Sequence, residues 1–294
     1  MQFFRPSSLR EALEIRAAHP EAMPIAGGTD LMVEVNFGRR RPGGFLDVSR
    51  LPELREIRRE GQTVRLGAGV PYARIIRELP GQVALTQAAR TVGSPQIRTR
   101  GTVGGNLGTG SPAGDALPVL AAYDARVVLA SATGTRTLPW HDFLLGPKRT
   151  ALAPDELIVA TEWEAADGPG SFSKVGTRNA MVIAIAGLSL QLDGAARRVR
   201  VALGSVGPTI LRAPEAEAFG AGVLDEAGAW SDPRARVPED AMARFGELVA
   251  EAARPIDDVR GTAAYRRHAC RVLARRALAW ALDDRRAAAM EAAS

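Results

Sequence analysis

Five glycines fall within ten residues between Gly101 and Gly110, and this density constrains the fold more than any other feature of the chain. Threonine, asparagine and serine side chains alternate with these glycines up to Pro112. Glycine permits positive φ angles and close approach of a ligand, and successive backbone N–H groups can then form an anion-binding nest. The stretch therefore predicts a loop that binds a phosphate-bearing ligand. Asp115 follows it at a predicted helix start, where a carboxylate can cap the helix or accept a ribose hydroxyl.

A shorter glycine motif, Ala26-Gly27-Gly28-Thr29-Asp30, stands where a strand is expected to give way to a helix. The dipole of a following helix would add to the attraction of its N–H groups for an anion. Taken alone, this motif is typical of an ordinary tight turn.

The usual nucleotide-binding motifs do not fit this sequence. Residues 108–113 match G-x-G-x-x-A, but more glycine precedes them instead of a buried strand. No parallel βαβ unit with an acid at its second strand is apparent, which argues against a Rossmann site. The chain also lacks the Gly-Lys-Ser/Thr of a P-loop.

Hydrophobic periodicity predicts an α+β protein. The expected strands cover residues 45–48, 63–68, 126–131, 135–140, 157–164, 186–192 and 199–204, and the expected helices include 82–92, 115–123, 238–253 and 262–282. Residues 165–170 form the best linker, so a domain boundary is expected near residue 168. We expect domains at 1–60, 61–168 and 169–294.

Composition excludes several kinds of site. A single cysteine, Cys270, and three scattered histidines cannot build a disulfide, a cysteine-ligated zinc site or an iron–sulfur cluster, so no metal site is expected. The net charge is +5, but only two basic residues are lysines and aromatics make up 5%, which argues against nucleic-acid binding. No apolar run approaches the length of a membrane helix and no export signal is visible, so a cytoplasmic protein is expected. No catalytic triad or carboxylate pair is evident.

Together, the two glycine motifs resemble those of the FAD-binding medium subunit of molybdenum hydroxylases, the family of xanthine, carbon monoxide and aldehyde dehydrogenase flavoproteins. The similarity rests on residues 24–31, 100–106 and 111–115, and is supported by 154–158, 174–181 and 260–267. It implies a two-subdomain FAD-binding (PCMH-type) module, followed by a C-terminal domain with a three-stranded sheet and a helical bundle.

The resemblance also implies which residues bind FAD. Ile25, Ala26, Gly27, Gly28, Thr29, Asp30 and Leu31 would cradle the pyrophosphate from one side, and Thr102, Val103, Gly104, Gly105 and Asn106 from the other. Thr109 would lie near the phosphate or ribityl chain, Asp115 near the adenosine half, Ile158 against the flavin or adenine, and Met181 near the isoalloxazine. Many relatives carry an acid where this chain has Val182, which bears on the electron-acceptor side.

The function implied is electron transfer through FAD, with no catalytic side chain in this subunit. An iron–sulfur small subunit and a molybdopterin large subunit would be the partners, in a dimer of heterotrimers. Electrons would pass from [2Fe–2S] centres to FAD and then to an external acceptor. Two alternatives remain open: a free-standing FAD-dependent oxidoreductase of the same fold, and a non-catalytic interaction subunit whose glycine motifs are only structural.

Overall fold

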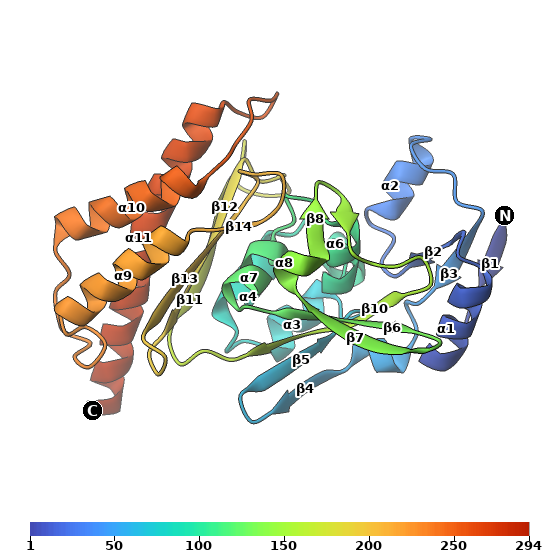
Figure 1. The fold of residues 1–294 in the computed structure, drawn as a ribbon, viewed down its shortest axis with the longest axis horizontal. Helices are drawn as coiled ribbons and strands as arrows, with labels where there is room; N and C mark the ends of the chain where they lie inside the picture. Colours follow the sequence, from blue (N-terminus) through green and yellow to red (C-terminus); the bar gives the residue numbers. More distant parts are fainter. Residues whose placement is uncertain (294) are drawn as a thin grey trace. The chain divides into compact units, whose positions relative to one another are not determined.

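The structure, a computed structural model, describes residues 1–293 and divides into two compact units (Figure 1). Unit 1 comprises residues 1–78, 92–111 and 124–164, and unit 2 comprises residues 79–91, 112–123 and 165 onward. Both units mix helices with sheets, which confirms the predicted α+β class.

Unit 1 begins with a small parallel sheet in the order β1-β3-β2. Its elements are β1 (Gln2–Phe4), α1 (Leu9–Ala18), β2 (Ala22–Ile25), α2 (Leu31–Asn36) and β3 (Gly44–Asp47). The segment β2-α2-β3 is a parallel βαβ unit whose second strand ends in an acid, Asp47, so the expectation of no such unit was wrong. These strands have only three or four residues, and β2 contains Pro24, so they lack the long apolar run typical of parallel strands.

The second sheet of unit 1 has five antiparallel strands in the order β4-β5-β10-β6-β7. These strands are β4 (Ile57–Glu60), β5 (Thr63–Gly67), β6 (Arg126–Ser131), β7 (Gly134–Pro139) and β10 (Leu157–Glu164), which confirms four of the predicted strands. The same unit holds η1 (Pro52–Arg55), α3 (Tyr72–Glu78), α5 (Pro95–Arg100), α6 (Val103–Thr109), α8 (Trp140–Phe143) and a short hairpin of β8 (Leu144–Gly146) and β9 (Arg149–Thr150).

A shared hydrophobic core joins the two sheets of unit 1. Leu46 of β3 and the η1 residue Leu54 pack in one cluster with Val128 of β6 and Val159 of β10. Because Ala26 packs against this core directly after β2, the core helps to fix the strand end from which the first glycine motif departs.

Unit 2 is built on a sheet in the order β11-β12-β13-β14. Its strands are β11 (Gly170–Val175), β12 (Ala186–Asp193), β13 (Arg198–Gly204) and β14 (Leu211–Arg212). Three long antiparallel strands match the expected three-stranded sheet, and β14 adds a two-residue edge. The helices are α4 (Val83–Thr91), α7 (Ala116–Ala122), α9 (Pro214–Glu226), α10 (Glu239–Ala252) and α11 (Ala263–Ala293).

Helices cover this sheet on both sides. Figure 1 shows α9, α10 and α11 on one side and α4 and α7 on the other, in agreement with the contacts of α11 and α7 with β12. The first seven residues of β12 are buried as a result. Helix α11 continues past the predicted end at Leu282, since the alanine-rich run that follows has high helix propensity.

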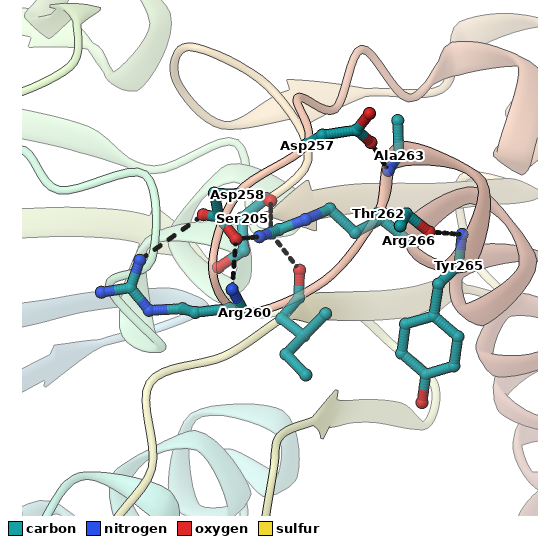
Figure 2. Close-up of polar contacts among 9 residues, drawn as sticks. Ser205, Asp257, Asp258, Arg260, Thr262, Ala263, Tyr265 and Arg266 are labelled. Atoms are coloured by element: carbon teal, nitrogen blue, oxygen red, sulfur yellow. Dashed lines mark hydrogen bonds and ion pairs between the residues drawn. The ribbon is translucent and has the colours of Figure 1, made fainter.

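Arg266 ties the start of α11 to the end of the sheet (Figure 2). Its guanidinium, almost wholly buried, donates to the carbonyl oxygens of Ile185 and Ser205 at 2.6 and 2.7 Å and to Asp258 Oδ1 at 2.6 Å. Asp257 Oδ1 accepts the backbone N–H of Ala263, the first residue of α11. These bonds fix the loop before α11 against the ends of β12 and β13.

Candidate cofactor site

The first glycine motif is a tight connection between β2 and α2. A Cβ on Gly27 would lie 2.0 Å from the carbonyl oxygen of Arg100, so only glycine fits. Gly28 has φ of +72°, a left-handed conformation that side chains disfavour. The motif is therefore held in one shape by its own backbone and by the segment that precedes α6.

This shape leaves a row of backbone donors open. Within residues 1–293, the N–H groups of Gly27, Gly28, Thr29, Asp30 and Leu31 donate to no protein acceptor. The N–H groups of Asp30 and Leu31 are at the start of α2, where the helix dipole is positive. Such a row of unpaired amides is suited to an anion of more than one phosphate.

The second glycine motif is a helix, so the prediction of a loop over residues 101–110 was wrong. Thr102 caps α6 by accepting the N–H of Gly105 at 2.9 Å, and Gly110, at φ of +58°, ends the helix. Val103 and Leu107 are buried. Gly104 packs against β5's end, where a Cβ would lie 2.5 Å from Ala68 Cβ. Tertiary packing and good caps thus outweigh the low helix propensity of glycine.

This helix uses much of the amide nest that the sequence predicted there. The N–H of Gly104 donates to Ala68 O at 3.1 Å, and that of Gly105 to Thr102 Oγ1. What α6 offers instead is an exposed face without side chains at Gly105 and Gly108, three residues apart. A bulky ligand can approach the helix backbone on this face.

Asn106 of α6 and Ile158 of β10 are two further predicted residues in this region. Asn106 Oδ1 is buried and, among the described residues, has no hydrogen-bond partner. Ile158 Cδ1 would be 3.6 Å from a Cβ on Gly108. Ile158 is half-buried at a bulge in β10, between buried Leu157 and Val159. The region of α6 and β10 thus offers an unsatisfied amide oxygen and an apolar side chain, a combination that fits one part of a nucleotide cofactor.

The structure brings the two motifs together. Thr109 Oγ1, at the end of α6, donates to Asp30 Oδ2 at 3.1 Å. Thr29 Oγ1 would lie 3.4 Å from a Cβ on Gly101, and Gly27 meets Arg100 as described above. Asp30 makes no side-chain cap on α2, because its carboxylate serves this bond. The two predicted motifs of unit 1 therefore meet, although Val103 and Gly104 are buried in the packing of α6, and the open amides and orphaned Asn106 oxygen fit FAD.

Lys148 and Glu34 border this site and were not foreseen. Lys148 Nζ is 2.5 Å from Glu34 Oε1, and Arg40 Nε is 2.7 Å from the other carboxylate oxygen. The hydrogen bond from Lys148 is the main cause of the lowered pKa of Glu34. The one signal that could have singled out Lys148 is the rarity of lysine in this chain.

Asp115 and Met181, the other predicted site residues, belong to unit 2. Asp115 Oδ2 accepts from Lys174 Nζ at 2.5 Å and from Thr91 Oγ1 at 2.9 Å, and the carboxylate is 8% exposed. Burial raises the pKa of Asp115, an effect that Lys174 and Thr91 partly offset. Lys174 also donates to the carbonyl oxygens of Thr91 and Val182 at 3.1 and 3.0 Å.

Met181 stands on an exposed loop that Lys174 helps to hold. Its φ is +50°, and its side chain is 55% exposed. Arg178 braces the loop by donating to the carbonyl oxygens of Ala180 and Met181. The site role expected for Met181 stays a prediction, as does that of Asp115.

Neither a metal-binding cluster nor a membrane-spanning helix is found in the described part of the chain. No group of three or more histidine, cysteine, aspartate or glutamate side chains could hold a metal ion there. None of the helices in residues 1–293 is long and apolar enough to cross a membrane.

Comparison with known proteins places the chain in a family. Residues 1–162 match the family described as the FAD binding domain in molybdopterin dehydrogenase, and residues 172–281 match the carbon monoxide dehydrogenase flavoprotein C-terminal domain. The nicotinate dehydrogenase FAD-subunit of Eubacterium barkeri is 37% identical over 206 residues, covering 66% of this chain and 70% of that protein. The carbon monoxide dehydrogenase medium chain of Hydrogenophaga pseudoflava is 30% identical over 290 residues, covering 95% of this chain and 97% of that one.

Solved structures agree with the sequence comparison. A chain of carbon monoxide dehydrogenase from Hydrogenophaga pseudoflava, in a form that lacks the Mo-pyranopterin moiety of the molybdenum cofactor, superposes with a TM-score of 0.84 at 30% identity. The match covers 97% of this chain and 98% of that chain. The chain therefore belongs to the family of FAD-binding medium subunits of molybdenum hydroxylases, the oxidoreductases that include carbon monoxide and xanthine dehydrogenases.

Proposed function

We propose that this chain carries FAD within a molybdenum hydroxylase complex and passes electrons from the [2Fe–2S] centres of a partner subunit to an external acceptor. The observation that carries the proposal is the joining of two glycine motifs around open backbone donors in unit 1. The relatives named above as FAD and medium chains support it.

The residues of unit 1 have distinct tasks in this proposal. The N–H groups of residues 27–31 bind the diphosphate, and the bare face of α6 lets the cofactor approach the backbone. Asn106 binds a polar group of the cofactor through its amide, and Ile158 packs against a ring. When bound, FAD supplies both one-electron and two-electron transfer, so the protein has only to bind and orient it.

The proposed partners are an iron–sulfur small subunit and a molybdopterin large subunit, in a dimer of heterotrimers. The buried Cys270 is the chain's single cysteine, so any iron–sulfur cluster must come from another chain. The proposal includes a cytoplasmic location, a division of the chain at residues 60 and 168, and positions for Asp115 near the adenosine and Met181 near the isoalloxazine.

Release of FAD from the purified, heat-denatured chain tests the proposal, and one equivalent per chain is the expected result. The variant Gly105→Asp places a carboxylate on the exposed face of α6, where a Cβ meets only Thr102 Oγ1 at 3.2 Å, so loss of FAD from a folded protein is expected. Gly134→Asp is the matched control, since nothing lies within 4 Å of a Cβ at that hairpin turn.

Three outcomes separate the alternatives. A wild-type chain without FAD would contradict the proposal. Unchanged flavin in Gly105→Asp would favour a purely structural role for the motif. A chain that holds FAD and oxidises a small substrate with no partner chains present would instead support a free-standing flavoenzyme.

A further inference from the structure

The helix that follows the first glycine motif is weakly anchored. Helix α2 has six residues, none of them buried, and Val33 and Phe37 along it and after it are 47% and 72% exposed. Apolar packing therefore contributes little to its position. Yet its N-cap Asp30 and its first residue Leu31 carry two N–H groups of the open amide row, so the position of the helix decides where those N–H groups point.

Hydrogen bonds from α6 and from the β8–β9 hairpin hold α2 in place instead of apolar packing. Thr109 bonds Asp30 at the start of α2, and Lys148 bonds Glu34 one turn later, at 3.1 and 2.5 Å. Lys148 is itself fixed to the end of α6, because its backbone N–H donates to Gly110 O at 3.0 Å. Its φ of +55° is a strained conformation for lysine, so the hairpin holds this residue against a local preference.

We propose that Lys148 and Glu34 are positioning residues for FAD, which hold the amide row of α2 in register with α6. This inference rests on the proposed function. Glu34 suits the role because its side chain is only 14% exposed although its helix is not buried, and its two oxygens engage separate cations. Lys148 connects α2 to the β8–β9 hairpin and the end of α6, whereas Arg40 lies in the loop after α2 and donates otherwise to Met23 Sδ of β2 at 3.7 Å, so it makes no link to α6.

A positioning role and a purely electrostatic role for the Lys148–Glu34 pair predict different effects of Glu34→Gln on FAD affinity. A nearby lysine attracts a diphosphate, and a nearby glutamate repels it. If charge alone mattered, Glu34→Gln would tighten FAD binding or leave it unchanged. If the pair positions the amides, Glu34→Gln weakens binding although it removes a negative charge.

Titration of the deflavinated chain with FAD, followed by flavin fluorescence, tests the inference by comparing variants with the wild type. We expect Lys148→Met and Glu34→Gln each to raise the FAD dissociation constant about fivefold, the factor a partly exposed ion pair supplies. Arg40→Met removes the same charge from the same carboxylate and should change it less than about twofold. Glu14→Gln, in the exposed Arg10–Glu14 pair of α1, is the control for an ion pair elsewhere in unit 1.

Each result bears on the inference. Wild-type affinity in Glu34→Gln, or an equal loss in Arg40→Met and Lys148→Met, would overturn it. Thermal unfolding of the deflavinated proteins separates general destabilisation from a loss confined to FAD binding, and Lys148→Arg should restore most of the affinity. A wild-type chain that binds no FAD would refute the proposed function, whereas unchanged variants of a flavin-binding chain would refute only the positioning role.

Discussion

Replacing Lys174 by methionine should strongly destabilise unit 2. The Lys174 side chain is 10% exposed, and its ammonium group has three acceptors: Asp115 Oδ2 and the carbonyl oxygens of Thr91 and Val182. Methionine fills a similar volume but donates nothing, so a carboxylate that is 8% exposed keeps only the hydroxyl of Thr91. Breaking a buried pair in this way leaves an uncompensated charge.

The size of the effect follows from that burial. Loss of one partner of a buried ion pair costs about 3–5 kcal/mol of unfolding free energy. In a chain of this length each kcal/mol lowers the melting temperature by roughly 2–4 °C, so a decrease of about 10 °C is expected. The exposed pair Arg197–Asp225, with side chains 59% and 61% exposed, supplies the control Arg197→Met, which should cost less than about 1 kcal/mol.

The pH dependence of this loss has a definite sign. Burial already raises the pKa of Asp115 above its ordinary value of 3.8, and removal of Lys174 takes away its main opposing influence. The folded variant then holds a proton that the unfolded chain releases, so its stability falls as pH rises from 3.8 through the raised folded pKa. The penalty should therefore be larger near pH 8 than near pH 4.

Thermal and urea unfolding of the purified chain at both pH values measures the penalty. A loss below about 1 kcal/mol, or one equal at both pH values, would refute the reasoning from a buried charge. The double variant Asp115→Asn, Lys174→Met should recover part of the stability, because it leaves no charge behind.

Two other results are expected. Gly104→Ala should lower the melting temperature, because its Cβ would lie 2.5 Å from both Cβ and O of Ala68 and overpacking costs roughly 1–3 kcal/mol of unfolding free energy. The control Gly105→Ala, in the same helix, should be tolerated. Equal losses of stability in the two variants would contradict the packing described for α6. Cys270 is buried, which raises the pKa of its thiol to about 12, so it should resist alkylation at pH 8 until the protein unfolds; rapid labelling of the native chain would contradict this.

The sequence predicted several of the longer elements well because each has a strong periodic pattern. It did not predict the 13-residue helix α9, and α11 continues to Ala293, past its expected end at Leu282. The antiparallel pair of β12 and β13, and helices α4 and α10, lie within one or two residues of the expected ranges. Of the short parallel strands, β3 was predicted at residues 45–48 and a strand was expected before the first glycine motif, but β1 was missed because its three residues carry too little periodicity.

The candidate site was predictable in composition but not in conformation. The glycine positions marked the segments that meet, yet α6 is a helix because Thr102 caps it and Ala68 leaves no room for a Cβ at Gly104. Pairings such as Lys148 with Glu34 join residues 114 positions apart, and no local pattern encodes them. The amide row was foreseen on both motifs, but in α6 the protein itself uses two of those donors.

Unit 2 is assembled from three separate segments of the chain, and this affects both its folding during synthesis and the fragments that can be expressed. The chain passes between the two units after residues 78, 91, 111, 123 and 164. Helices α4 and α7 are therefore synthesised well before the sheet they cover, and must wait for β11 to β13 to leave the ribosome. A fragment starting at residue 169 would carry the sheet without these helices, exposing one face of β12. Such a fragment should aggregate on expression, whereas addition of residues 79–123 in the same chain should restore a cover for that face.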